Sequence, residues 1–282
     1  MGCDWQSYVN VLPIWMRDYV DRQGRDTLLE LRLRLGLPPE LYTSRGSIWM
    51  QRQVEKDDLL FCINAASRYS PWSAATMSRG FITAPGGHRL GLCGTATIQD
   101  GKMTGISVTT SICFRVAREY YGISKNLNEV PGSILIIGKP GSGKTTLLRD
   151  LICQKSESSS GCICVIDEKS ELFPCNTEGF SFRCGSRTDV LSGCPKETGI
   201  DAVLRNMGPA VIAVDEITAE EDCKALVHAG WCGVTLFATA HAANPSDLMN
   251  REIYRPLIES RLFDFLVVMQ PDKSWRLERI NK

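Results

Sequence analysis

Long apolar runs are absent from this sequence, and histidine is scarce. No apolar stretch approaches the ~18 residues that a membrane-spanning helix needs, so we expect no transmembrane segment. The first ten residues, MGCDWQSYVN, lack both a basic region and a long apolar core, which argues against a secretory signal. Only three of the 282 residues are histidines, so each can be weighed separately.

A surplus of charge of either sign is also missing. Lys and Arg number 32, Asp and Glu number 32, and the formal net charge is therefore zero. This balance gives no electrostatic reason to expect nucleic acid as a partner. No stripe of interleaved basic and aromatic residues suggests one either, so we expect no nucleic-acid partner. A composition of 43% hydrophobic and 23% charged residues is typical of a globular protein.

Cysteine is plentiful, but it lacks the spacing of a metal site. The chain has 12 cysteines and no C-x-x-C pair. Cys162 and Cys164 in CICVIDE come nearest, and on a strand their side chains would face the same side. Because most of the cysteines stand in apolar contexts, we interpret them as small buried hydrophobic residues and expect no structural zinc.

The first 120 residues carry the mixed patterns of an α+β domain, smaller than the one that follows. The segment 28–37, LLELRLRLGL, alternates with a period of two, which predicts a strand with Leu29, Leu31, Leu33, Leu35 and Leu37 on its apolar face. Residues 57–69 have helical spacing, with Leu59, Leu60, Ile63 and Ala66 apolar. Residues 80–106 predict short strands joined by Gly-Gly and Asp-Gly turns.

The pattern changes after a polar stretch at 121–132, which we interpret as a linker. Residues 133–282 contain short, nearly continuous apolar runs: SILIIG, CICVIDE, AVIAVDEI, GVTLFATA and FDFLVVM. Strands that are apolar on both faces indicate a sheet covered on both sides. We therefore predict an α/β domain with a mainly parallel sheet over 133–282.

The segment GKPGSGKT, residues 138–145, fits the phosphate-binding pattern G-x-x-x-x-G-K-[ST]. It follows the apolar run ILII and precedes the helical pattern TTLLRDLIC, the context that the pattern requires. Glycines let the backbone bring its N–H groups to phosphate oxygens, Lys144 would reach the β and γ phosphates, and Thr145 would bind Mg²⁺. The expected ATP-contacting residues are Gly138, Lys139, Pro140, Gly141, Ser142, Gly143, Lys144, Thr145 and Thr146.

Two of the apolar runs end in Asp-Glu. Asp215 follows AVIAV and is our expected second Mg²⁺ ligand besides Thr145. Asp167 and Glu168 follow CICVI, and carboxylates at the edge of a core are costly unless they are used. We expect one acid to orient the attacking water. Glu168 is favoured over Glu216, and both remain open.

Three arginines are candidates for stabilising charge on the γ-phosphate. Arg183 and Arg187 lie in SFRCGSRTDV, and Arg205 lies in VLRNMGPAV, just before the run that ends at Asp215. We expect Arg183 or Arg187 to reach a nucleotide, if need be across a boundary between subunits. The alternative is that each is a solvated surface side chain.

His241 is the histidine whose position suggests a function. LFATAHAAN places Thr239 and His241 directly after an apolar run, at the sheet edge where α/β domains bind ligands. We favour a role in sensing the γ-phosphate, and a buried core histidine is the alternative. His88, in a turn, and His228, near the end of a helix, are expected to have no such role.

The order of these segments resembles the secretion ATPase superfamily of type II and type IV secretion motors. That resemblance implies a RecA-like core, hexameric assembly and an acidic box at Asp167 and Glu168. It also implies a second acidic strand at Asp215 and Glu216 and a histidine box at Thr239 and His241. Arg205 stands where that superfamily has an arginine before the second acidic strand.

Within the superfamily, the chain resembles the sporulation ATPases of endospore-forming Firmicutes. The segments LLELRLRLGLP, GFITAPGGHRLGLCG, SICFRVAREYYG and DVLSGCPKETGI carry this similarity beyond the ATPase half. It implies a cytoplasmic ATPase of the mother cell that energises a channel to the forespore. It also implies peripheral membrane association through a small membrane protein. The alternatives are a nucleotide-dependent scaffold with little turnover and a DNA-acting RecA-like motor.

Overall fold

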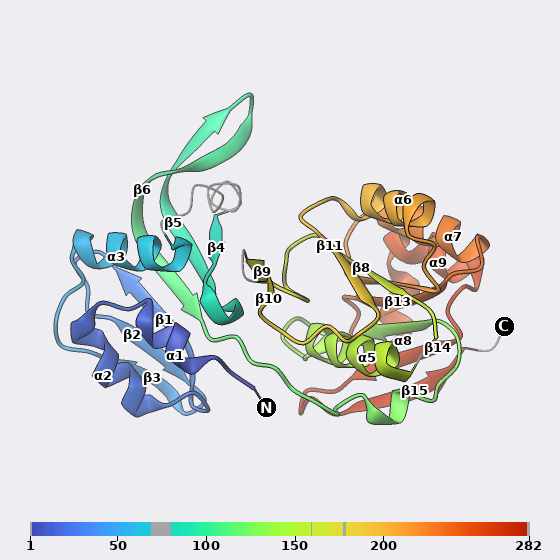
Figure 1. Ribbon diagram of the computed structural model, residues 1–282, viewed down its shortest axis with the longest axis horizontal. Helices are drawn as coiled ribbons and strands as arrows, with labels where there is room; N and C mark the ends of the chain where they lie inside the picture. Colours follow the sequence, from blue (N-terminus) through green and yellow to red (C-terminus); the bar gives the residue numbers. More distant parts are fainter. Residues whose placement is uncertain (1, 69–79, 159, 177–178, 281–282) are drawn as a thin grey trace. The chain divides into compact units, whose positions relative to one another are not determined.

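The computed structural model describes residues 2–68, 80–158, 160–176 and 179–280. The chain forms two compact units, drawn in Figure 1. The first comprises residues 1–119 together with 174–182, and the second comprises residues 120–173 together with 183–282. A short segment from the second half of the sequence therefore belongs to the first unit.

The first unit is built on a six-stranded antiparallel sheet in the order β3-β2-β1-β6-β5-β4. Its strands are β1 (Leu28–Arg34), β2 (Glu40–Thr43), β3 (Gly46–Trp49), β4 (Phe81–Thr83), β5 (Arg89–Gln99) and β6 (Lys102–Arg115). Its helices are α1 (Trp5–Asn10), α2 (Ile14–Gln23), α3 (Lys56–Ser67) and the 3-10 turn η2 (Pro85–Gly87). A separate hairpin pairs β9 (Cys175–Asn176) with β10 (Gly179–Phe180).

The predicted alternation in β1 is correct in the middle of the strand and wrong at its ends. Leu31 and Leu33 are fully buried, as expected. Leu29 is exposed because the pairing with β2 is irregular between Leu28 and Glu30, and Leu28 occupies the core instead. The expected leucines after β1, at 35 and 37, are also exposed, because they lie beyond the end of the strand.

The helix predicted at 57–69 is α3, and it begins one residue earlier, at Lys56. Its first turn is capped by Asp58, whose carboxylate accepts the Glu55 N–H at 2.9 Å. Of the four predicted apolar positions, Leu59, Ile63 and Ala66 are buried, whereas Leu60 is exposed and Cys62 takes its place in the core. Tyr69, the last residue of the predicted range, lies outside the described residues.

Strands β5 and β6 are longer than the short strands predicted here. They form a hairpin of 11 and 14 residues that reaches beyond the rest of its sheet (Figure 1). The predicted Asp-Gly turn joins them, and Asp100 and Gly101 both have positive φ, as tight hairpin turns require. Before β5, His88 is fully buried and contacts the Asp4 carbonyl and the Ala117 N–H, so it is a core histidine.

The second unit contains a seven-stranded sheet in the order β11-β8-β12-β13-β7-β14-β15. Every neighbouring pair is parallel except β14 and β15, which confirms the predicted mainly parallel sheet. The strands are β7 (Ile134–Ile137), β8 (Ile163–Asp167), β11 (Thr188–Ser192), β12 (Val211–Ile217), β13 (Thr235–Ala240), β14 (Phe265–Met269) and β15 (Trp275–Arg279).

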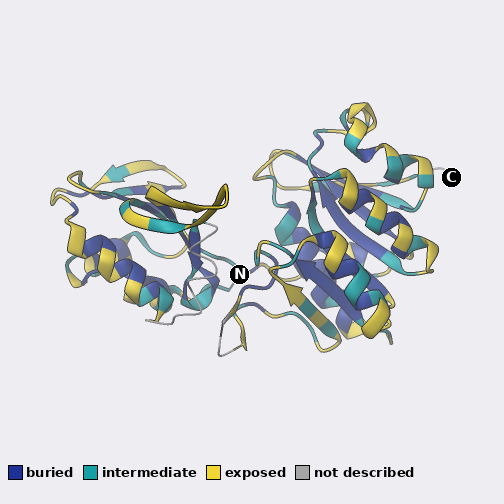
Figure 2. Cartoon of the chain, turned by 90° about the horizontal axis from the view of Figure 1, so that it is seen from above, coloured by how far each residue is buried: buried dark blue, intermediate teal, exposed yellow. Residues whose placement is uncertain are grey.

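Helices cover both faces of this sheet, and most residues of its central strands are buried, as the dark blue strands in Figure 2 show. One face packs against α6 (Lys196–Asn206), α7 (Glu220–Trp231) and α9 (Arg255–Ser260), and the other packs against α5 (Lys144–Ser158). The remaining elements are α8 (Pro245–Asn250), η3 (Lys125–Leu127) and η4 (Glu252–Tyr254). No helix within the described ranges has the length and apolarity needed to cross a bilayer.

Candidate nucleotide-binding site

The predicted phosphate loop, the acids and the histidine all lie at the carboxyl edge of the parallel sheet. The loop follows β7, Glu168 follows β8, and His241 follows β13. Since β13 lies between β7 and β12, the strand order places His241 between the loop and the Asp215-Glu216 pair. In an open α/β sheet this edge is where ligands bind.

The loop has the backbone shape of a phosphate cradle. Gly141 and Gly143 have φ of +74° and +100°, a region that side-chain-bearing residues rarely adopt. A Cβ on Gly138 would lie 2.5 Å from the Ser142 hydroxyl oxygen and 2.7 Å from the Met269 Cβ. Among the described residues, Ser142 Oγ is the one buried side-chain nitrogen or oxygen without a hydrogen-bond partner. A phosphate oxygen would satisfy it, so the loop fits a nucleotide.

The other loop residues are arranged around that cradle. Lys139 and Pro140 are exposed at its tip, and Thr145 and Thr146 are half-buried in the first turn of α5. A helix amino terminus adds exposed N–H groups and a partial positive charge, which favours an anion. The loop therefore offers the positive groups that a polyphosphate needs.

Lys144 is buried at the centre of the site. Its ammonium donates hydrogen bonds to the carbonyls of Gly138 at 2.9 Å and Lys139 at 3.1 Å. It also donates to His241 Nδ1 at 3.0 Å. Burial lowers the pKa of Lys144, and the nearby carboxylates of Asp215 and Glu216 oppose that shift. The lysine is thus held beside the loop and remains within reach of the histidine.

His241 connects Lys144 to Glu216. Its Nδ1 accepts from Lys144, so its Nε2 carries the proton in the neutral ring and donates to Glu216 Oε1 at 2.8 Å. The backbone N–H of His241 donates to the Tyr254 hydroxyl at 3.2 Å, and that hydroxyl donates to the Ile217 carbonyl. A continuous chain of hydrogen bonds therefore runs from Lys144 to Glu216 in the acidic strand.

Thr239 sets the geometry of that acidic strand. Its buried hydroxyl accepts the Glu216 N–H at 2.7 Å and donates to Asp215 Oδ1 at 2.6 Å. Glu216 has φ of +55°, and the register of β12 against β13 shifts between Val214 and Ile217. The strand bulges there, and the threonine hydroxyl replaces a backbone hydrogen-bond partner at the bulge.

Both carboxylate oxygens of Glu216 are engaged. One accepts from His241, and the other forms a short ion pair with Lys169. Burial by itself would raise the pKa of Glu216, but the hydrogen bonds from Lys169 and His241 outweigh it, and the pKa is lowered. A lowered pKa makes a carboxylate a weaker base.

Asp167 and Glu168 have different environments. Asp167 is buried and accepts the backbone N–H groups of Glu171 at 2.9 Å and Phe173 at 2.8 Å. Burial raises the pKa of Asp167 to about 6. Its carboxylate therefore shapes the loop after β8. The Glu168 side chain is 37% exposed at the same edge of the sheet.

Lys196 is a residue of this edge that the sequence reasoning missed. Its side chain is 2% exposed and donates to Glu168 Oε2 at 2.6 Å, with Asp222 Oδ2 at 3.7 Å. A lysine in the first turn of a helix opposes the helix dipole, and this unfavourable placement in CPKETGI is a signal that could have identified it. Lys196 joins the start of α6 to the start of α7 and to Glu168.

The three predicted arginines are not brought to the loop within one chain. Arg205 pairs with Asp201 in the last turn of α6. Arg183 pairs with Glu157, and the Arg187 N–H donates to Ser156 Oγ at 2.7 Å. Ser156 and Glu157 lie at the far end of α5, which at 1.5 Å per residue is about 20 Å from the loop.

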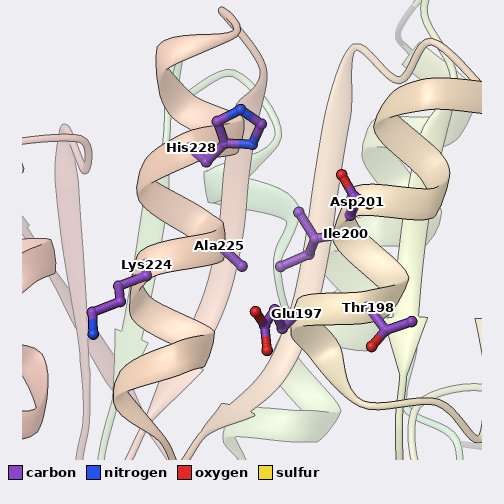
Figure 3. A pocket seen from close by; sticks show the side chains of 7 residues that line it. All are labelled: Glu197, Thr198, Ile200, Asp201, Lys224, Ala225 and His228. Atoms are coloured by element: carbon purple, nitrogen blue, oxygen red, sulfur yellow. The ribbon is translucent and has the colours of Figure 1, made fainter.

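A separate surface hollow of about 470 Å³ lies between α6 and α7. Figure 3 shows its lining side chains on the two helices: Glu197, Thr198, Ile200, Asp201, Lys224, Ala225 and His228. None of the predicted site residues is in that lining. His228 stands in the last turn of α7, as its position near a helix end predicted.

Comparison with known proteins identifies relatives of this chain. Residues 6–278 match the family model described as "Sporulation stage III, protein AA". Stage III sporulation protein AA of Bacillus subtilis (strain 168) is 35% identical over 269 residues, which cover 90% of this chain and 87% of that relative. The match spans both units.

Solved structures agree on the fold. The pilus retraction motor PilT, solved with bound ADP, has a TM-score of 0.67 and 16% identity, covering 96% of this chain and 84% of its own. The ATPase DotB of Legionella pneumophila has a TM-score of 0.58 and 18% identity, covering 95% of this chain and 80% of its own. At such identities the likeness concerns the fold alone. It supports the predicted α/β fold.

Proposed function

The chain belongs to the stage III sporulation protein AA family, and from that membership and its phosphate loop we propose that it binds and hydrolyses ATP. The observation that carries the proposal is the connection from Lys144 through His241 to Glu216. This connection joins a phosphate-binding lysine to an acid beside the expected metal ligand. A site that only bound phosphate would have no need of it.

The residues divide the work of phosphoryl transfer. The loop glycines and Ser142 hold phosphate oxygens, and Lys144 neutralises their charge. Thr145 and Asp215 would hold Mg²⁺, for which a hydroxyl and a carboxylate are suitable oxygen ligands. When bound, the ion neutralises charge that develops on the phosphates. Thr239 orients Asp215 for this role through the 2.6 Å hydrogen bond.

Glu168 is the acid that we propose to activate water. Glu216 has both oxygens engaged and a lowered pKa, which make it a poor proton acceptor. Glu168 is more exposed and lies on the neighbouring strand end, held by Lys196 at 2.6 Å. Glu216 then serves as the group through which His241 responds to the nucleotide.

Steady-state phosphate release with Mg²⁺ and ATP tests these roles. We expect Lys144→Ala to abolish turnover and weaken nucleotide binding. Glu168→Gln should lower kcat more than about 100-fold while ATP remains bound, as expected for loss of a general base. ATP binding without Lys144-dependent turnover would instead support a nucleotide-dependent scaffold. If Glu216→Gln lost turnover and Glu168→Gln stayed active, Glu216 would be the acid that activates water.

We further propose that the protein works as a homo-oligomer, a hexameric ring in the mother cell. By its resemblance to secretion motors, it would energise a channel to the forespore from the membrane surface, docked on a small membrane protein. The positions of three arginines support this proposal. Arg183, Arg187 and Arg205 lie away from the phosphate loop of their own chain and could contact a nucleotide bound to a neighbouring chain. Mass measurement with a non-hydrolysable ATP analogue tests this, and a monomer at all concentrations would contradict the ring.

A further inference from the structure

Two cysteines and an aspartate converge at the edge of the sheet opposite the phosphate loop. Cys162 immediately precedes β8, Cys164 lies within it, and Asp189 is paired with Cys164 from β11. The two Sγ atoms and a carboxylate oxygen of Asp189 all lie within 4.8 Å of one another. Residues two apart on a strand share a face, and parallel pairing places Asp189 beside them.

The spacing of the two sulfurs matches a tetrahedral metal centre. Cys162 Sγ and Cys164 Sγ are 3.8 Å apart. Two thiolates bound at about 2.3 Å to a tetrahedral zinc ion are separated by about 3.8 Å, so neither side chain has to move to bind one ion. Asp189 Oδ2 lies 2.8 Å from Cys162 Sγ, from which it accepts a hydrogen bond that a bound ion would replace.

Solvent can reach the cluster of three side chains. Cys164 is buried, whereas Cys162 is half-buried and Asp189 exposed, which leaves a path from solvent.

We propose that Cys162, Cys164 and Asp189 form a binding site for a thiophilic divalent cation of the zinc type. Two sulfurs and one oxygen leave the fourth tetrahedral position to water. The ion would join β8 to the edge strand β11 at their amino ends. Along β8, Cys162 is about 16 Å and Cys164 about 10 Å from the sheet edge that carries the phosphate loop, so the proposed site is separate from Mg²⁺ binding.

Cobalt titration of the reduced, metal-free full-length protein tests the site. We expect a thiolate-to-cobalt charge-transfer band that saturates at one Co²⁺ per chain and disappears when Zn²⁺ is added. Cys162→Ser and Asp189→Asn should each weaken Co²⁺ binding at least about 10-fold, the lower range for losing a group at a metal site. Zn²⁺ should raise the melting temperature of the unmodified protein and not that of Cys162→Ser.

Controls separate this site from the other cysteines. Cys232→Ser removes an exposed thiol at the end of α7 and should leave the band unchanged. Asp189→Asn changes an exposed side chain, so it keeps the test valid if Cys162→Ser fails to fold. Absence of a saturable band, or a band equally strong in Cys162→Ser and Asp189→Asn, would overturn the proposal. ATP binding is measured separately. A failure to bind ATP would not change the interpretation of the Co²⁺ titration.

Discussion

At the scale of single residues, Thr239 determines how the acids of β12 are presented. Thr239→Val preserves the shape of the side chain and removes both hydrogen bonds of its hydroxyl, to the Glu216 N–H and to Asp215. We expect turnover to fall about 10- to 100-fold, as for other groups that orient metal ligands. Phosphate release measures the effect.

Thr239→Ser is the matched control, because it keeps the hydroxyl and loses one methyl group. It should retain most of the turnover, and circular dichroism should show that both variants are folded. Equal activity of Thr239→Val and the unmodified protein would mean that the hydroxyl does not orient Asp215.

Lys196 is the second residue whose substitution should have a large effect, in this case on the stability of the fold. Lys196→Met should lower the free energy of unfolding by about 2–3 kcal/mol, because it leaves the buried Asp222 without its cation and removes the hydrogen bond to Glu168. Urea denaturation measures this change. Lys224→Met, which removes the exposed pair with Glu220, is the control and should leave the midpoint unchanged. Similar midpoints for the two variants would show that the buried pair contributes little.

At the scale of secondary-structure elements, the β5–β6 hairpin depends on one close backbone approach. A Cβ on Gly94 would lie 1.8 Å from the Val108 carbonyl oxygen, where the pairing of the two strands is irregular. Gly94→Ala should therefore destabilise the hairpin by about 2 kcal/mol, the scale of overpacking. Amide hydrogen exchange over residues 94–110 should be faster in this variant.

Gly105 offers a matched control in the same hairpin. A Cβ there would meet nothing within 4 Å, so Gly105→Ala should leave the exchange unchanged or slightly slower. If both alanine variants exchange alike, the approach of Gly94 to Val108 does not limit the hairpin's stability.

At the scale of the whole molecule, the arginines suggest that a complete site needs two copies. Arg183 and Arg187 lie at the far end of α5 from their own loop. We expect the double variant Arg183→Ala, Arg187→Ala to lose more than about 100-fold in turnover, because arginines on the γ-phosphate have effects of at least that size. Mixing it with Lys144→Ala should restore part of the activity. The restored sites would take the lysine from one copy and the arginines from another.

Arg255→Ala removes an exposed arginine of α9 and serves as the control, with normal turnover expected. Unchanged turnover in the double variant would show that Arg183 and Arg187 do not act on the γ-phosphate. Loss of turnover without recovery on mixing would place their effect within one chain.

Features that depend on neighbouring residues could be predicted from the sequence alone. The phosphate loop is one uninterrupted segment, and the ends of the apolar runs located Asp215 and His241, because strand length and polarity are local properties. The alternation in β1 predicted Leu31 and Leu33 correctly. It failed at Leu29, since a bulge depends on the partner strand and not on the strand's own sequence.

The way in which distant residues combine could not be predicted without the folded structure. Asp167 and Glu168 are adjacent in sequence, yet the folded loop turns one inward and leaves the other at the edge. Lys196 and Asp189 acquire their roles from strands and helices that pack beside β8. The physical reason is that burial and pairing arise between segments far apart in the chain, and these interactions set which carboxylate is buried and which cysteines lie beside a carboxylate.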